Sequence, residues 1–144
     1  ESPGLQDCIS FVPGVNDVKI VQLYEQRELA VVPSLYEGFS LPAIEAMSTG
    51  ICLVATTGGA LPEVTGVDRE TVLSCVAGDA DALAATIRRG LDDKQLRDKI
   101  GLAGRARVAE RWSWRHCAQL TVDQYREVLS MPENHRKIAK RQSN

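Results

Sequence analysis

The chain has 144 residues, 44% of them hydrophobic, and its 17 basic and 19 acidic side chains give a formal net charge of −2. These values predict one domain with an ordinary core, and they exclude the basic surface that a nucleic-acid backbone requires, so no nucleic-acid partner is expected. No apolar run is long enough to span a membrane, and the opening ESPGLQD is unlike a signal peptide, so we expect a soluble, cytoplasmic protein.

The four cysteines follow no metal-binding or redox spacing. Three of them lie inside apolar runs, which predicts reduced thiols in the core of a cytosolic protein and no metal site. An extracellular disulfide pair is the alternative. The four are Cys8, Cys52, Cys75 and Cys117.

Short continuous apolar runs predict four strands that are covered on both faces. Between the first two strands, Asn16 or Asp17 can cap a helix that ends near Glu28. The predicted strands span residues 8–12, 29–32, 51–55 and 72–76.

Two further helices are predicted between these strands. Ser40 is placed to cap the first of them, with Pro42 in its first turn and a stop at Gly50. A short helix at residues 61–64 follows a turn at residues 56–59.

Helical spacing of apolar residues predicts three helices in the second half. The first is capped by Asp79 or Asp81, and the last begins at Ser113. The apolar stripe of the last helix is predicted to pack in the core. Residues 132–144 are basic and predicted to be disordered, with contact to anionic lipid as the alternative.

Strands that alternate with helices predict an α/β fold with a doubly wound parallel sheet, here half of a Rossmann-like domain followed by C-terminal helices. Residues 1–131 form this domain, and residues 132–144 form the tail. Such sheets bind ligands where the carboxyl ends of strands meet the amino ends of helices.

Residues 31–50, VVPSLYEGFSLPAIEAMSTG, combine two carboxylates with an expected helix start. Glu37 precedes the helix, and Glu45 lies about one turn inside it. Gly38 allows a ligand to approach the backbone, and the unpaired N–H groups of the first turn favour a phosphate. A phosphate flanked by two carboxylates that accept hydrogen bonds from hydroxyls describes a nucleotide-sugar.

This segment, followed by VATTGGALPEV, resembles the signature of glycosyltransferase family 4, a retaining group with the GT-B fold. The similarity extends from Ile9 to about Tyr125 and includes RWSW at residues 111–114. It implies that this chain is part of the C-terminal, donor-binding domain of a transferase for hexoses from UDP-, GDP- or ADP-linked donors, such as UDP-glucose or GDP-mannose. It also implies a role in polysaccharide or glycolipid synthesis.

The resemblance implies a role for each site residue. Glu37, the catalytic candidate, would bind hydroxyls of the donor sugar. Backbone N–H groups of Gly38, Phe39, Ser40 and Leu41 would bind sugar and diphosphate oxygens. Glu45 would bind the ribose. The acceptor would attack the face from which the nucleoside diphosphate leaves, helped by preorganised donors more than by a side-chain base. No metal or other cofactor is expected.

Several parts of the family pattern are not in this chain. Ser40 stands where the family commonly has glycine. The arginine and lysine that hold the diphosphate, two strands of the sheet and the domain for a glycan or lipid-linked acceptor would precede residue 1. We therefore expect a fragment that is inactive alone. It would expose its sheet edges, re-pair them, or use them for strand exchange or a dimer. The parent protein is expected in the cytoplasm or at the inner face of the membrane.

Other interpretations stay open. Glu37 and Glu45 can be solvated charges at a helix end, or a glycosidase pair. Residues 79–81, Asp-Ala-Asp, match a metal-binding DxD but are explained by capping, and His116 is expected to be a packed or surface residue. A silent nucleotide-sugar-binding or assembly module and a GT-B epimerase are the alternative functions.

Overall fold

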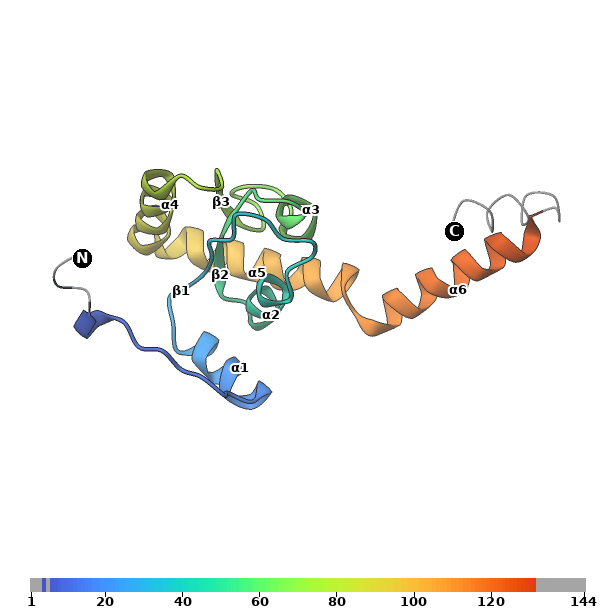
Figure 1. Ribbon diagram of the computed structural model, residues 1–144, viewed down its shortest axis with the longest axis horizontal. Helices are drawn as coiled ribbons and strands as arrows, with labels where there is room; N and C mark the ends of the chain where they lie inside the picture. The colour runs from blue at the N-terminus through green and yellow to red at the C-terminus, as the bar shows by residue number, and fades with distance from the viewer. Residues whose placement is uncertain (1–3, 5, 132–144) are drawn as a thin grey trace.

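The computed structural model describes residue 4 and residues 6–131, and it contains a compact body from which one long helix projects (Figure 1). The elements follow one another as a 3₁₀ helix η1 (Gln6–Cys8), α1 (Asp17–Glu25), β1 (Leu29–Val32), α2 (Leu41–Thr49), β2 (Cys52–Thr56), α3 (Leu61–Thr65), β3 (Leu73–Cys75), α4 (Ala80–Asp92), α5 (Lys94–Arg111) and α6 (Trp114–Ser130).

The three strands form a parallel sheet in the order β1-β2-β3. Leu29 pairs with Cys52, and Ala55 pairs with Ser74. Every residue of the central strand β2 is buried, as expected for a parallel strand that helices cover on both faces. The predicted α/β fold and three of the four predicted strands are therefore confirmed, with ends shifted by at most one residue.

The fourth predicted strand, residues 8–12, is wrong. Cys8 ends the 3₁₀ helix η1, and the following residues are in no strand of the described chain. Phe11 is 92% exposed, and Ile9 and Val12 are each about half exposed. An apolar run becomes a strand only where another strand accepts its backbone hydrogen bonds, and no strand in the described residues is paired with it.

Side-chain caps begin four of the helices, and two of them, Asn16 and Asp79, are residues that the sequence predicts as caps. Asn16 accepts a hydrogen bond from the Lys19 N–H at 2.9 Å, and α1 ends at Glu25 instead of near Glu28. Asp79, not Asp81, caps α4 through the Ala82 N–H at 2.8 Å. The other two caps are Asp93 on α5, by the Leu96 N–H, and Ser113 on α6, by the His116 N–H.

The core lies between the sheet and helices α2, α4 and α5. Met47, Leu53 and Ile100 are fully buried there. Helices α2 and α5 make a close contact through Gly101, because a Cβ at this position would overlap the carbonyl oxygen of Gly50. Burial of these side chains is the main source of stability for the body.

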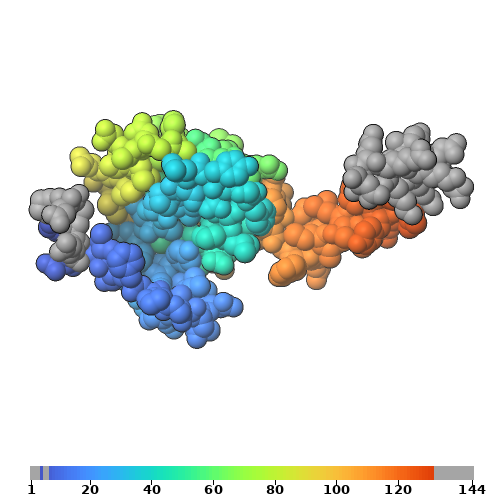
Figure 2. All heavy atoms as spheres, in the orientation of Figure 1, coloured from blue at the N-terminus to red at the C-terminus, as the bar shows by residue number. Residues whose placement is uncertain are grey.

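Helix α6 does not pack in the core, so this prediction is wrong. It buries none of its residues, and it leads away from the body (Figures 1 and 2). Trp114 is 92% exposed and Tyr125 is 66% exposed. The apolar stripe is present, but the described part of the chain offers it no surface to cover. The predicted tail, residues 132–144, lies outside the described residues.

The cysteines divide into two pairs, and all four are free thiols. Cys52 and Cys75 are buried, as predicted, whereas Cys8 and Cys117 are exposed, so a core position for all four is wrong. None of the helices in the described chain is both long and apolar enough to cross a membrane.

Candidate functional site

The loop after β1 holds Glu37 in a defined position. The Ser34 hydroxyl donates to Oε1 of Glu37 at 2.7 Å, and the Ala60 N–H donates to the Glu37 carbonyl oxygen at 2.8 Å. The Thr56 hydroxyl, at the carboxyl end of β2, donates to the Ser34 carbonyl oxygen. Glu37 is half-buried. The structure thus places this carboxylate at the carboxyl ends of β1 and β2, the edge at which parallel sheets bind ligands.

The Gly58–Gly59 turn supports this loop by close backbone contact. A Cβ at Gly58 would overlap the Leu35 carbonyl, and one at Gly59 would overlap the backbone of Glu37. Gly59 also has φ +62°, in the left-handed region that favours glycine. The turn is therefore required for the position of the loop that carries Glu37, a role that the dipeptide alone did not reveal.

The amino end of α2 has unused donors. Among the described residues, no hydrogen bond uses the backbone N–H groups of Gly38, Phe39, Leu41 or Ala43, and the Ile44 N–H reaches the Ser40 carbonyl oxygen at 3.4 Å. A Cβ at Gly38 would meet nothing within 4 Å. Free N–H groups and the positive end of the helix dipole favour an anion at this place.

Ser40 differs from its prediction as a side-chain cap. It precedes the helix, but its hydroxyl makes no capping hydrogen bond and its backbone is left-handed, with φ +78°. A cap residue needs extended backbone for its oxygen to reach the next N–H groups, so this conformation excludes the interaction. Pro42 lies in the first turn and Gly50 ends the helix with φ +83°, both as predicted.

An aromatic contact joins this turn to the end of α5. The rings of Phe39 and Trp112 pack edge to face with centroids 5.1 Å apart. Trp112 follows the last residue of α5 and donates its backbone N–H to the Val108 carbonyl oxygen. The side chain of Phe39 thus connects the turn before α2 to the end of α5.

Glu45 lies beside helix α1. It lines a hollow of about 280 Å³ between α1 and α2, together with Asp17, Ile20, Val21 and Tyr24 of α1 and with Ser48 and Thr49. Burial, and secondarily the negative charge of Glu45, raises the pKa of the Tyr24 hydroxyl. The sequence pattern contains no separate signal for this position of Tyr24, because its spacing is that of any apolar residue of the helix.

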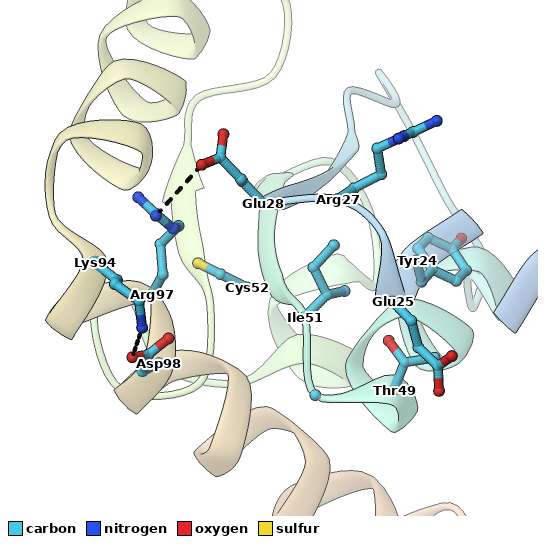
Figure 3. Close-up of a pocket in the computed structure, with 11 residues that line it drawn as sticks. Tyr24, Glu25, Arg27, Glu28, Thr49, Ile51, Cys52, Lys94, Arg97 and Asp98 are labelled. Carbon is cyan, nitrogen blue, oxygen red and sulfur yellow. Dashed lines mark hydrogen bonds and ion pairs between the residues drawn. The ribbon is translucent and has the colours of Figure 1, made fainter. Parts of the chain in front are cut away.

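A second hollow, of about 440 Å³, lies at the opposite edge of the sheet, where β1 and β2 begin (Figure 3). Four of its charged groups form two pairs: Arg97 lies 3.7 Å from Glu28, and Lys94 lies 2.6 Å from Asp98. Because the side chain of Arg97 also donates to the Gly90 and Leu91 carbonyls at the end of α4, it is used in holding the fold. This hollow is not the candidate site.

Asp79 and His116 belong to other parts of the fold. Asp79 uses its carboxylate to cap α4, and no group of three metal-ligating side chains occurs within the described residues. His116 is exposed on the first turn of α6. The candidate site therefore consists of Glu37, the amino end of α2 and Glu45.

Comparison with known proteins identifies the family. The family described as Glycosyl transferases group 1 matches residues 1–107. The chain is 40% identical over 127 residues to an MMP alpha-(1->4)-mannosyltransferase of Mycolicibacterium hassiacum, which covers 88% of this chain and 31% of that protein. It is 36% identical over 118 residues to O-antigen chain mannosyltransferase B of Escherichia coli, covering 82% and 30%.

Similar solved structures are also glycosyltransferases or related synthases. A sucrose-phosphate synthase from Thermosynechococcus elongatus has a TM-score of 0.79 and 34% identity, covering 88% of this chain and 31% of that one. The C-terminal domain of a glycosyl transferase group 1 family protein from Francisella tularensis has a TM-score of 0.63 and 30% identity, covering 74% and 53%. The chain spans about a third of the length of the curated relatives named above. It belongs to the group 1 glycosyltransferases, and its sheet and helices are part of a GT-B domain of that family.

Proposed function

We propose that the protein transfers a hexose from a nucleoside-diphosphate sugar to an acceptor hydroxyl with retention, and that this chain supplies part of the donor site. One observation carries the proposal: unused N–H groups at the amino end of α2 lie in sequence between two carboxylates, Glu37 and Glu45. This arrangement matches an anion with hydroxyl-bearing groups on either side. The named mannosyltransferases among its relatives are consistent with a hexose donor.

Each part of the proposed donor has a place. Glu37, oriented by Ser34, accepts hydrogen bonds from sugar hydroxyls. The N–H groups of Gly38 to Leu41 bind sugar and diphosphate oxygens, and the negative charge of the departing diphosphate is stabilised there. Glu45 binds the ribose hydroxyls beside the hollow between α1 and α2.

The reaction then depends on position and charge. The acceptor hydroxyl attacks from the face that the nucleoside diphosphate leaves, and the departing phosphate takes its proton. Preorganised donors that stabilise the developing negative charge supply the rate enhancement, so no metal is part of this proposal. A glycan or lipid-linked acceptor would be bound by residues outside this chain, with peripheral membrane contact in the lipid-linked case.

Calorimetric titration with UDP, GDP and ADP tests the proposal. We expect one of the three to bind the chain and Glu45→Ala to abolish that binding, because the variant removes the acceptor for the ribose hydroxyls. Glu127→Ala, on the projecting helix α6, is the matched control and should bind like the parent.

Equal binding by Glu45→Ala and the parent would remove the ribose role from Glu45. Absence of binding in this chain and in any longer product of the same gene would instead identify a silent module of the same fold. For a longer product that binds, the anomeric configuration of the glycoside, measured by NMR, tests retention.

A further inference from the structure

Ser40 combines two unfavourable features at one residue. Its backbone has φ +78°, which L-residues with a Cβ seldom adopt, and its side chain is buried, with 5% exposure of the residue. The hydroxyl oxygen Oγ has no hydrogen-bond partner. Buried polar groups are nearly always satisfied, so a hydroxyl that is neither solvated nor bonded requires an explanation.

This unsatisfied hydroxyl is next to other unused donors. Within the described chain, two buried side-chain polar atoms lack a partner, Oγ of Ser40 and Nε1 of Trp112. Both residues adjoin Phe39, one along the chain and the other through the ring contact. The backbone N–H groups of Leu41 and Ala43 are also unused. The indole and backbone N–H groups can only donate, and a serine hydroxyl can donate as well, so an acceptor is the one kind of partner that would satisfy all of them.

Within the described residues, the Ser40 hydroxyl makes no hydrogen bond that would stabilise the fold. The hydroxyl does not cap α2, and a glycine at this position would remove both the strain at positive φ and the unsatisfied oxygen. A residue with unfavourable backbone and side-chain features at a ligand-binding edge is characteristic of functional sites. The side chain therefore fits a role toward a ligand.

We infer that the Ser40 hydroxyl donates a hydrogen bond to a phosphate oxygen of a nucleoside diphosphate bound at the amino end of α2. This inference rests on the proposed function and extends it from the backbone to this side chain. Rotation about the Cα–Cβ bond of Ser40 moves the hydroxyl without moving the backbone. A hydroxyl bonded to an ionised phosphate oxygen forms a strong, charge-assisted hydrogen bond. In the complex, this bond would offset the cost of a Ser40 hydroxyl that is unpaired in the free protein.

The test compares two ligands that differ only in their phosphates. The chain, Ser40→Ala and Ser40→Gly are titrated with the nucleoside diphosphate that binds the parent and with the corresponding nucleoside. Both variants should bind the diphosphate about tenfold or more weakly, as expected for loss of a hydrogen bond to a charged group, and should bind the nucleoside unchanged. Ser130→Ala, an exposed serine on α6, is the matched control and should change neither affinity.

Thermal unfolding of the same variants distinguishes ligand binding from folding. Ser40→Gly should melt at the same temperature as the parent or higher, because strain and an unsatisfied group are both removed. A lower melting temperature with unchanged diphosphate affinity would give Ser40 a structural role and overturn the inference.

Two more outcomes separate the inference from the function on which it rests. Unchanged diphosphate affinity in both Ser40 variants, with binding still abolished by Glu45→Ala, would overturn the inference and leave the proposed function. Failure of every nucleoside diphosphate to bind the parent would overturn both.

Discussion

Helices α2 and α6 both carry an apolar stripe, but only one of them buries it. Helix α2 packs on β2 and α5 and buries Ala43, Ala46 and Met47, whereas α6 buries none of its residues. The contrast shows that an apolar stripe predicts an interface without predicting its location. The partner surface decides whether the stripe becomes part of the core, because burial requires two surfaces that meet.

The same contrast applies to the two ends of the chain. The strands and helices from β1 to α5 cover one another, and residues 8–12 and helix α6 at the flanks expose Phe11 and Trp114 almost completely. Exposed apolar groups of this size contribute little to the stability of the body. Matched pairs of substitutions therefore test how the stability is distributed. Each pair compares a closely packed position in the body with an exposed position.

The largest expected difference is between two leucines. Leu53→Ala in β2 removes a fully buried side chain and should lower the free energy of unfolding by about 2–5 kcal/mol, because the surrounding core cannot close the cavity. Leu120→Ala on α6, where the side chain is 53% exposed, should change it by less than about 0.5 kcal/mol. Urea unfolding measures both. Similar losses would mean that α6 is part of the cooperative unit.

A smaller difference is expected between two glycines near the candidate site. Gly58→Ala forces a methyl group against the Leu35 carbonyl and should cost about 1–3 kcal/mol, with weaker nucleotide binding because the loop of Glu37 moves. Gly38→Ala places its methyl group in open space and should change stability by less than about 0.5 kcal/mol. If both variants were equally stable, the close contact of the turn with the loop would not be needed.

The smallest expected difference is in how stability depends on pH when a buried thiol, Cys52, or an exposed thiol, Cys117, is removed. Burial raises the pKa of Cys52 from 9.0 to about 11, against the opposing charge of Arg97. As pH rises above 9, the unfolded thiol ionises first, so the unfolded state gains stability and the protein loses about 1–2 kcal/mol by pH 11. Buried Cys75, whose pKa is also raised, adds to this loss.

Unfolding measured from pH 8 to pH 11 checks this prediction. Cys52→Ala should be less stable at pH 8 but should lose less stability with rising pH. Cys117→Ala, which removes an exposed thiol of α6, should follow the parent. An equal pH dependence in all three proteins would assign the loss to other groups.

Much of the body could be predicted from local pattern. The runs that became β1, β2 and β3 are apolar and short, and the caps at Asn16, Asp79 and Asp93 act within three residues of themselves. The start of α2 between the two glutamates, with Pro42 in its first turn, was also predicted correctly, although the capping role of Ser40 was not. The binding roles of Glu37 and Glu45 stay predictions.

The errors have one physical cause. Residues 8–12 and the stripe of α6 were predicted to be buried because they are apolar, but a strand needs a neighbour for its N–H and C=O groups and a stripe needs a facing surface. Ser40 was predicted to cap α2 from its residue type. In the structure its backbone is left-handed, which excludes capping. The loop before it contacts the Gly58–Gly59 turn and Trp112.

By itself, the sequence determined the order of the strands and helices from α1 to α6, most of their ends and the segment that resembles a donor site, because these depend on residues close together in the chain. The tertiary structure alone decided which apolar stripes are buried, that the Gly58–Gly59 turn supports the loop of Glu37, that Glu45 faces Tyr24, and that the Ser40 hydroxyl is left without a partner. Each of these depends on contacts between segments that pattern and propensity do not encode.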